Sequence, residues 1–241
     1  MTTTHSASTL VRAFQVAGAL LFLISLAMFG RAYLRQFDAV AAADASPWLP
    51  LLGNVALFSA FALHHSVLAR TRLKERLRAR VGVDVERVLY VSLASILFLA
   101  CTQLWMPLPG TWYRLTGPWW WAGIGVQSAG VAVTLLAART LSLRELMGLE
   151  RPRQCGHPEE KPVLETRGLY RVVRHPIYFG WVLLVAGAPV MTSTRLLFAV
   201  VSVAYLVVAI PLEERSLVEN FGDPYRAYRR QVRWRMLPGV Y

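Results

Sequence analysis

Six apolar runs alternate with polar, mostly basic segments along this chain. They cover roughly residues 13–30, 48–69, 88–106, 118–137, 177–191 and 196–212. The first four approach the roughly 20 residues that an α-helix needs to cross a bilayer, whereas the last two are shorter. Pro189 lies near the turn between these two. The pattern predicts an all-α integral membrane protein with about six transmembrane helices, the last two forming a short helical hairpin.

The stretch after the last apolar run has a different pattern. Apolar residues recur there at helical spacing, at Leu217, Phe221, Tyr225, Tyr228 and Val232. Such spacing between charged residues is typical of an amphipathic helix on a membrane surface. The sequence Phe221-Gly222-Asp223-Pro224 predicts a break within it. No Ser/Gly-rich linker divides the chain, so we expect one membrane domain, residues 1–241.

Composition agrees with a membrane location, since 55% of the residues are hydrophobic and the mean hydropathy is +0.41. The net charge of +12 would suggest a nucleic-acid partner in a soluble protein. However, 21 of the 26 Lys and Arg residues fall within 70–87, 139–175 and the tail after 211. We therefore expect the lipid bilayer, with its anionic surface, rather than nucleic acid, to be the partner of these charges.

The same three basic segments set the orientation. If the chain has six spans and a cytoplasmic N-terminus, all three lie on one side, which the positive-inside rule makes the cytoplasm. We expect a multi-pass protein with both termini and the polar junctions on that side. The opposite side would carry an aromatic belt formed by Trp48, Trp105, Trp112, Trp119, Trp120 and Trp121.

Cysteine and histidine usage predicts neither a disulfide nor a metal site. Cys101 lies in an apolar run and Cys155 in an expected cytoplasmic segment, so the two do not pair. Cys155 and His157 supply only two ligands, too few for zinc.

Polar residues that could take part in catalysis or ligand binding lie where the fifth apolar run starts. Because proline fits the first turn of a helix, Pro176 predicts a helix start with His175 close to the N-cap. A helix N-terminus presents free N–H groups that favour an anion. Tyr178 lies in this first turn, and Gly180 permits close approach of a backbone or ligand. The combination suits a zwitterion with a carboxylate, an aromatic base and a ribose; the alternative is that Arg174 is an interfacial anchor, His175 a cap and Tyr178 a belt residue.

Two acidic residues, Glu213 and Glu214, follow Pro211 at the end of the sixth run. Carboxylates at a membrane junction are costly unless they are paired or functional. They could hold ribose hydroxyls or a cation, or they could cap a cytoplasmic helix that starts after Pro211. Since the apolar stretch before them is long enough to go out and return, we expect both polar clusters to meet at one membrane face.

Three motifs occur in order: Gly-Leu-Tyr-x-x-Val-Arg-His-Pro-x-Tyr-x-Gly at 168–180, Glu-Glu-x-x-Leu at 213–217 and Phe-Gly-x-x-Tyr-x-x-Tyr at 221–228. Together they resemble the isoprenylcysteine carboxyl methyltransferase family and its phospholipid methyltransferase relatives, over roughly residues 160–238. The segments around His64-His65 and 86–90 are similar to the bacterial NnrU-like branch, which includes methanethiol S-methyltransferases.

The resemblance implies S-adenosyl-L-methionine (SAM) bound at the cytoplasmic end of the last two spans. Its cofactor-binding set would be Tyr170, Val173, His175, Pro176, Tyr178, Gly180, Glu213, Glu214 and Leu217. Arg174 would lie beside the transferred methyl group, forming with Glu214 the catalytic pair. Residues 141–241 would then form the catalytic core and residues 1–140 would shape the acceptor site. The long loop 144–165 would cover the site or shape the acceptor pocket, and the protein would lie in a bacterial inner membrane.

The residues also bear on the methyl acceptor. A thiol must become a thiolate, and a nearby Arg lowers its pKa. A carboxylate arrives ionised and could be held by an Arg fork, whereas an amine needs a general base, for which only Glu214 and His175 are at hand. The sequence supplies Arg174 but no dedicated base. As methyl acceptor we therefore favour a small or lipophilic thiol, or a prenylcysteine-type carboxylate, over a phospholipid amine.

His64 and His65 lie near the cytoplasmic end of the second run and are our candidates for substrate binding, although a structural role is also open. The resemblance leaves two alternative functions, a haem-binding NnrU-like protein with an isomerase or redox role and a phospholipid amine N-methyltransferase. We predict no protein partner.

Overall fold

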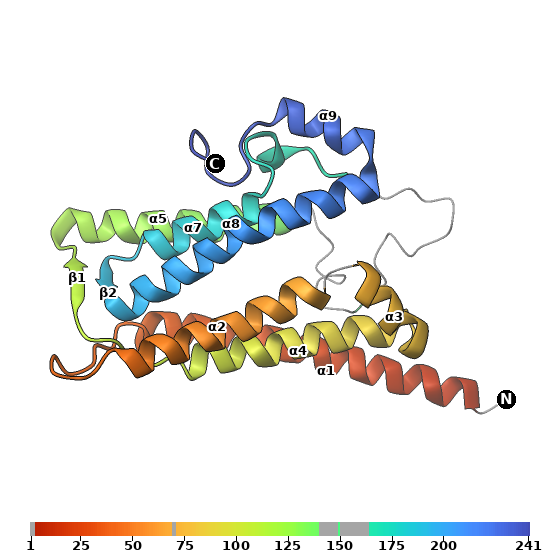
Figure 1. Cartoon of the computed structure of the whole chain (residues 1–241), viewed down its shortest axis with the longest axis horizontal. Coiled ribbons are helices and arrows are strands. Elements are labelled where there is room, and N and C mark those ends of the chain that lie inside the picture. Colours follow the sequence, from red (N-terminus) through yellow and green to blue (C-terminus); the bar gives the residue numbers. More distant parts are fainter. Residues whose placement is uncertain (1–2, 69–70, 140–148, 150–163) are drawn as a thin grey trace. The chain divides into compact units, whose positions relative to one another are not determined.

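The computed structural model describes residues 3–68, 71–139, 149 and 164–241, and almost all of its regular structure is helical (Figure 1). The described residues divide into two compact units. The first is formed by residues within 3–34 and 53–105, the second by residues within 35–52, 106–139 and 164–241. The predicted role of loop 144–165 falls almost wholly outside the described residues, as do Cys155 and His157.

The first unit is built on helices α1 to α4. Their bounds are Thr3–Arg31 for α1, Trp48–Leu68 for α2, Thr71–Val81 for α3 and Val83–Gln103 for α4, and a π-helical turn, Ala32–Gln36, follows α1. Helices α1 and α4 pack together at Gly18, where an added Cβ would lie 2.9 Å from Val88 Cγ1. Gly82, at φ +82°, forms the turn between α3 and α4. An ion pair of 2.8 Å between Arg78 and the buried Glu86 joins these two helices.

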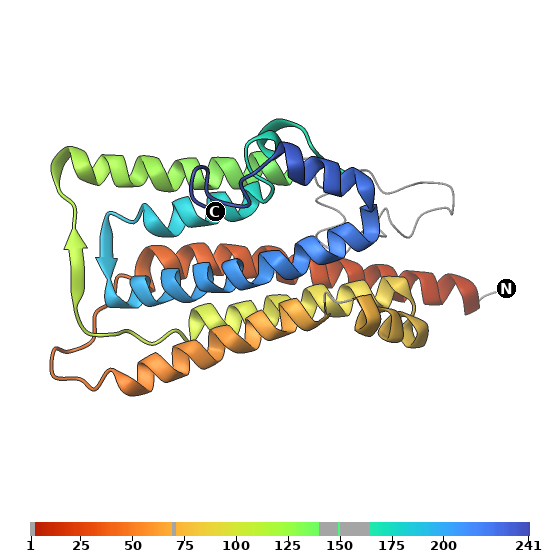
Figure 2. The same ribbon diagram turned by 45° about the horizontal axis from the view of Figure 1, so that its top comes forward.

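The second unit contains α5 (Gly117–Ala138), α7 (Pro176–Ala186), α8 (Ser193–Phe221) and α9 (Asp223–Gln231), with a 3₁₀ turn at Gly168–Arg171. Figure 2 shows α5 and α7 running alongside one another. Glycines permit this approach, because a Cβ on Gly180 would lie 2.6 Å from the carbonyl oxygen of Gly130. Gln127 adds a hydrogen bond of 3.0 Å from Nε2 to the carbonyl of Leu184.

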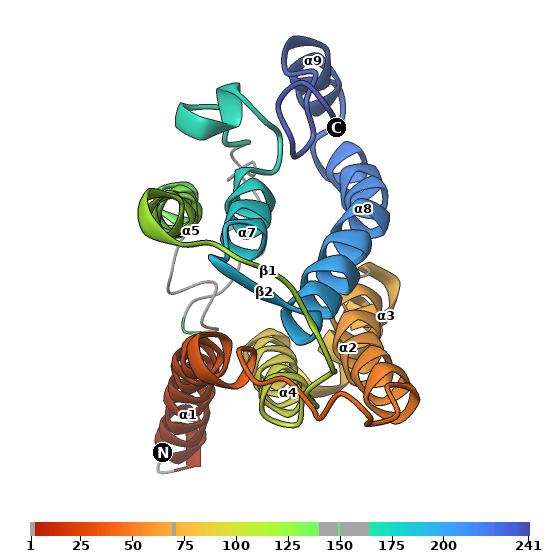
Figure 3. The ribbon, with the colours of Figure 1, turned by 90° about the vertical axis from the view of Figure 1, so that its left-hand side faces the viewer.

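A two-stranded ribbon at one end of the second unit departs from the predicted all-α architecture. Strand β1 (Thr111–Arg114) pairs antiparallel with β2 (Val190–Thr192), side by side in Figure 3. Thr192 donates a hydrogen bond of 2.6 Å to the carbonyl of Phe37, and Thr194 donates one of 3.0 Å to that of Ala39. The start of α8 is therefore fixed to the residue 35–52 segment.

Most of the predicted aromatic belt is exposed, with large exposed fractions at Trp48, Trp112, Trp119 and Trp121. Trp105 is the exception, because it is only 5% exposed. Its assignment to the belt is wrong, and its indole is part of the protein core.

Four helical segments are long and apolar enough to cross a membrane: Thr9–Gln36, Val83–Gln103, Gly117–Ala138 and Ser193–Phe221. Helix α7 is a shorter apolar helix. A helical integral membrane protein is therefore confirmed, while the count of six spans stays a prediction.

The predicted short final helix is wrong, because α8 is 29 residues long and continues through Pro211 and both glutamates. Proline has no N–H to donate to the carbonyl four residues earlier, which here belongs to Val207. That carbonyl instead accepts a hydrogen bond of 3.2 Å from the Tyr241 hydroxyl. The helix therefore passes Pro211 without leaving this carbonyl unpaired. It ends at Phe221, and Gly222, at φ +63°, forms the predicted break before α9.

Candidate functional site

A buried ion pair joins the start of α7 to α8. Nε of Arg174 donates a hydrogen bond of 2.6 Å to Oε1 of Glu214, and the two residues are 8% and 2% exposed. Nη1 of Arg174 donates to the carbonyls of Val232 (2.7 Å) and Arg233 (2.9 Å). Its Nη2 donates to none of the described residues, so this nitrogen keeps hydrogen-bonding capacity.

Local backbone structure explains why these side chains converge. Helix α7 starts at Pro176 with His175 at the N-cap, as predicted. The backbone N–H groups of Arg174 and His175 donate to the carbonyls of Trp234 (2.9 Å) and Arg235 (2.8 Å). The segment after α9 is thereby held against the start of α7.

His175 lies between the two carboxylates. Its Nδ1 is 3.7 Å from Oε2 of Glu213 and its Nε2 is 3.6 Å from Oε1 of Glu214, both longer than a normal hydrogen bond. The ring stacks on Tyr178, with centroids 5.4 Å apart and planes at 6°. Tyr178 donates a hydrogen bond of 2.8 Å to Glu213. Nε2 of His175 is buried and has no hydrogen-bond partner in the described structure, which leaves one polar atom for a ligand.

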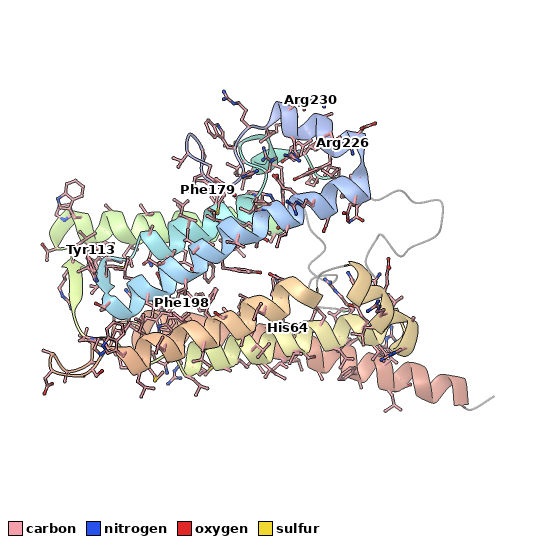
Figure 4. The ribbon with its side chains drawn as sticks, in the orientation of Figure 1. His64, Tyr113, Phe179, Phe198, Arg226 and Arg230 are labelled. Atoms are coloured by element: carbon pink, nitrogen blue, oxygen red, sulfur yellow. The ribbon has the colours of Figure 1, made fainter. Side chains whose placement is uncertain are left out.

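Two further arginines flank Glu214. Nε of Arg235 lies 3.6 Å from Oε2 of Glu214, and Nε of Arg229 lies 3.8 Å from the same atom. With Arg174, three guanidinium groups therefore lie within 4 Å of the Glu214 carboxylate. Sequence analysis did not single out Arg229 or Arg235, which it counted only among the basic residues of the tail after 211. Figure 4 labels two other arginines of α9, Arg226 and Arg230, and both are exposed.

An aromatic cluster of Tyr225, Tyr228 and Val232 packs beside these charges. Tyr170 and Leu217 pack against it, and Tyr228 donates a hydrogen bond of 2.7 Å to the carbonyl of Tyr170. Burial, the largest cause, raises the pKa of both phenols, Tyr225 and Tyr228, so both stay neutral at physiological pH.

The structure thus brings most of the predicted cofactor set together. Arg174, His175, Tyr178, Glu213 and Glu214 form one polar network, which we call the Arg174 network. Val173 and Pro176, the sequence neighbours of Arg174 and His175, are both buried. Gly180 is different, because it packs against α5; this contact alone accounts for the glycine, and its part in cofactor binding stays a prediction.

His64 and His65 lie on α2 in the first unit, where Figure 4 labels His64. The ring of His64 stacks on Tyr90, with centroids 5.5 Å apart. Nδ1 of His65 is 3.1 Å from the Tyr90 hydroxyl. Both ring nitrogens of His64 are buried without a hydrogen-bond partner among the described residues. No group of three or more metal-ligating side chains occurs in the described part of the chain.

Comparison with known proteins identifies the class. Residues 149–224, which contain Arg174, His175, Tyr178, Glu213 and Glu214, match the model of the phospholipid methyltransferase family. This match, together with the long apolar helices, is that of a membrane methyltransferase. No solved structure matches the chain.

The relatives narrow the family further. Methanethiol S-methyltransferase 1 of Bradyrhizobium diazoefficiens is 36% identical over 192 residues, covering 78% of this chain and 67% of the relative. The methanethiol S-methyltransferase of Mycobacterium tuberculosis is 34% identical over 229 residues, covering 90% and 93%. The chain belongs to the family of these enzymes. A protein-S-isoprenylcysteine O-methyltransferase of Dictyostelium discoideum is 28% identical over 51% of this chain and 50% of its own.

Proposed function

We propose that the protein transfers the methyl group of SAM to the sulfur of a small thiol of the methanethiol class. The observation that carries the proposal is the buried Arg174–Glu214 pair, in which one guanidinium nitrogen, Nη2, makes no hydrogen bond to the described residues. The bacterial relatives named methanethiol S-methyltransferase support this acceptor class.

The residues around Arg174 suit the polar parts of SAM. Glu213, whose side chain is 42% exposed, can accept from ribose hydroxyls or from an ammonium group. Nε2 of His175 is buried and lacks a partner in the described structure, as expected of a ligand contact. The excess of guanidinium over carboxylate groups favours a ligand carboxylate nearby. Together these groups form a donor site in which SAM supplies an electrophilic methyl group on a sulfonium.

Arg174 is proposed to hold the nucleophile. A guanidinium lowers the pKa of an adjacent thiol, and the thiolate, rather than the thiol, is the nucleophile. The thiol proton leaves to solvent, the acceptor sulfur forms a bond to the methyl carbon, and the bond between that carbon and the donor sulfur breaks with its electron pair on the donor. Positive charge on the donor sulfur disappears in this step. Alignment and exclusion of water are therefore the main tasks of the chain.

The acceptor side rests on separate residues. We retain His64 and His65 as proposed substrate contacts, because the buried nitrogens of His64 have no partner within the described residues. In this proposal residues 141–241 form the core that binds the methyl donor, and residues 1–140 shape acceptor binding. We also propose a bacterial inner membrane as its location, with the Arg174 network on the cytoplasmic face.

The test uses detergent-purified protein and SAM with a labelled methyl group. Three acceptors are offered separately: methanethiol, an S-prenylated cysteine, and phosphatidylethanolamine in mixed micelles. We expect labelled dimethyl sulfide from the first. Label confined to the prenylcysteine ester or to the lipid amine would overturn the proposed acceptor, and absence of transfer to all three would overturn the function.

Paired variants locate the site in the same assay. Arg174→Gln removes the charge that we assign to the thiolate, and transfer should be lost. Arg171→Gln removes an exposed charge three residues earlier and serves as the control. Equal turnover in the two variants would contradict the role of Arg174. Calorimetric titration of SAM into His175→Ala and Glu213→Ala should show weakened binding in both.

A further inference from the structure

One buried polar atom in the second unit, on Tyr225, lacks a hydrogen-bond partner within the described ranges. The hydroxyl of Tyr225 makes no hydrogen bond to any described residue, although Tyr225 is only 1% exposed. Its neighbour on the same helix face, Tyr228, is 4% exposed and donates to the carbonyl of Tyr170. The two phenols therefore share their helix and their burial but differ in hydrogen bonding.

An unmade hydrogen bond of this kind is costly, and a core residue would avoid it. Buried polar groups in folded proteins are nearly always paired with protein or with ordered water. A phenylalanine at position 225 would fill almost the same volume at no such cost. The hydroxyl is therefore best explained by a partner that is bound only during function.

The charges around Tyr225 indicate the nature of that partner. The carboxylates of Glu214 and Glu213 raise the pKa of the Tyr225 phenol, after burial as the largest cause, and Arg174 lowers it, so all three act on this hydroxyl. Arg229 and Arg235 approach Glu214 from the same C-terminal region. Three guanidinium groups within 4 Å of the single carboxylate of Glu214 leave an excess of positive charge there, which attracts an anion. A neutral phenol donates a short hydrogen bond to a carboxylate.

We propose that the Tyr225 hydroxyl donates a hydrogen bond to the carboxylate of the bound methyl donor. This inference rests on the proposed function, because it takes SAM as the ligand of the Arg174 network. It makes Tyr225 a specificity residue that recognises the aminoacyl end of the donor, a role that no motif in the sequence assigns to it.

The experiment compares Tyr225→Phe with Tyr228→Phe in the full-length, detergent-purified protein. Dissociation constants are measured for SAM and for decarboxylated SAM, which lacks only the carboxylate. Thermal unfolding of each variant is followed without ligand. We expect Tyr225→Phe to raise the dissociation constant for SAM by about tenfold or more, in line with the loss of a hydrogen bond to a charged group. Its affinity for decarboxylated SAM and its unfolding temperature without ligand should match the wild type or exceed it.

Tyr228→Phe should show the opposite behaviour, with a lower unfolding temperature and an unchanged preference for SAM over decarboxylated SAM. Equal SAM affinity in wild type and Tyr225→Phe would overturn the inference. An equal loss of affinity for SAM and for decarboxylated SAM would overturn it too. A fall in the unfolding temperature of Tyr225→Phe as large as that of Tyr228→Phe would also overturn it, because the hydroxyl would then have a structural partner. If the wild type itself fails to bind SAM, the proposed function fails with it.

Discussion

Nε of Arg174 lies 2.6 Å from Oε1 of Glu214, which places a charged hydrogen bond inside the second unit between the start of α7 and a point about three-quarters along α8. Loss of one partner of a buried ion pair leaves an uncompensated charge, whereas replacement of both by apolar side chains is often nearly neutral. Stability and activity can therefore be separated at this pair.

We expect Glu214→Leu alone to lower the free energy of unfolding by about 3 kcal/mol or more. The double variant Arg174→Met/Glu214→Leu should recover most of this loss, yet neither variant should transfer methyl groups. Denaturant unfolding in detergent and the methanethiol assay measure the two effects. Turnover in the double variant would show that the pair has only a structural role.

Gly180→Ala tests the contact between α5 and α7. The new Cβ would lie 2.6 Å from the carbonyl oxygen of Gly130, so the helices must separate, and we expect a loss of about 1–3 kcal/mol. Gly125→Ala on α5 is the matched control, because nothing lies within 4 Å of its added Cβ. Equal unfolding temperatures for the two variants would argue against close packing at Gly180.

Tyr241→Phe removes the hydroxyl that pairs with the carbonyl of Val207, where Pro211 supplies no N–H. The same hydroxyl accepts a hydrogen bond of 3.1 Å from Arg235, which lies beside Glu214. We expect a stability loss of about 1 kcal/mol, measured by thermal unfolding. Tyr113→Phe, whose exposed hydroxyl makes a long contact of 3.5 Å, should change stability much less.

His64→Phe tests the acceptor side. Because neither ring nitrogen has a hydrogen-bond partner in the described structure, the change removes no bond there and keeps an aromatic ring against Tyr90. We expect unchanged stability and SAM affinity with a severalfold higher KM for the thiol. An unaltered KM would remove His64 from the acceptor site.

Local signals in the sequence were sufficient for several features. Pro176 predicted the start of α7 because proline is favoured in the first turn of a helix. Gly222 predicted the break before α9 because glycine readily adopts the positive φ that the structure has there. The convergence of Arg174 with Glu214 was also predicted, since the apolar stretch between them is long enough to go out and return.

The remaining features depend on contacts between distant residues. The β1–β2 ribbon pairs segments about 80 residues apart with three or four residues each, too short for a periodic pattern. Arg229 and Arg235 reach Glu214 because the segment after α9 turns back on α7, which no local pattern predicts. The length of α8 was missed because the pairing of Val207 with Tyr241 compensates for Pro211.

Helix α8 also sets the distance between the ribbon and the Arg174 network. Thr192, its N-cap, is fixed by the Phe37 carbonyl at the ribbon, and Glu214 lies twenty-two residues further along the same helix. At a rise of 1.5 Å per residue this is about 33 Å, close to the hydrocarbon thickness of a bilayer. The distance between the ribbon and the Arg174 network is thus set by the length of α8, and one residue inserted between Thr192 and Glu214 would turn Glu214 by about 100° away from Arg174.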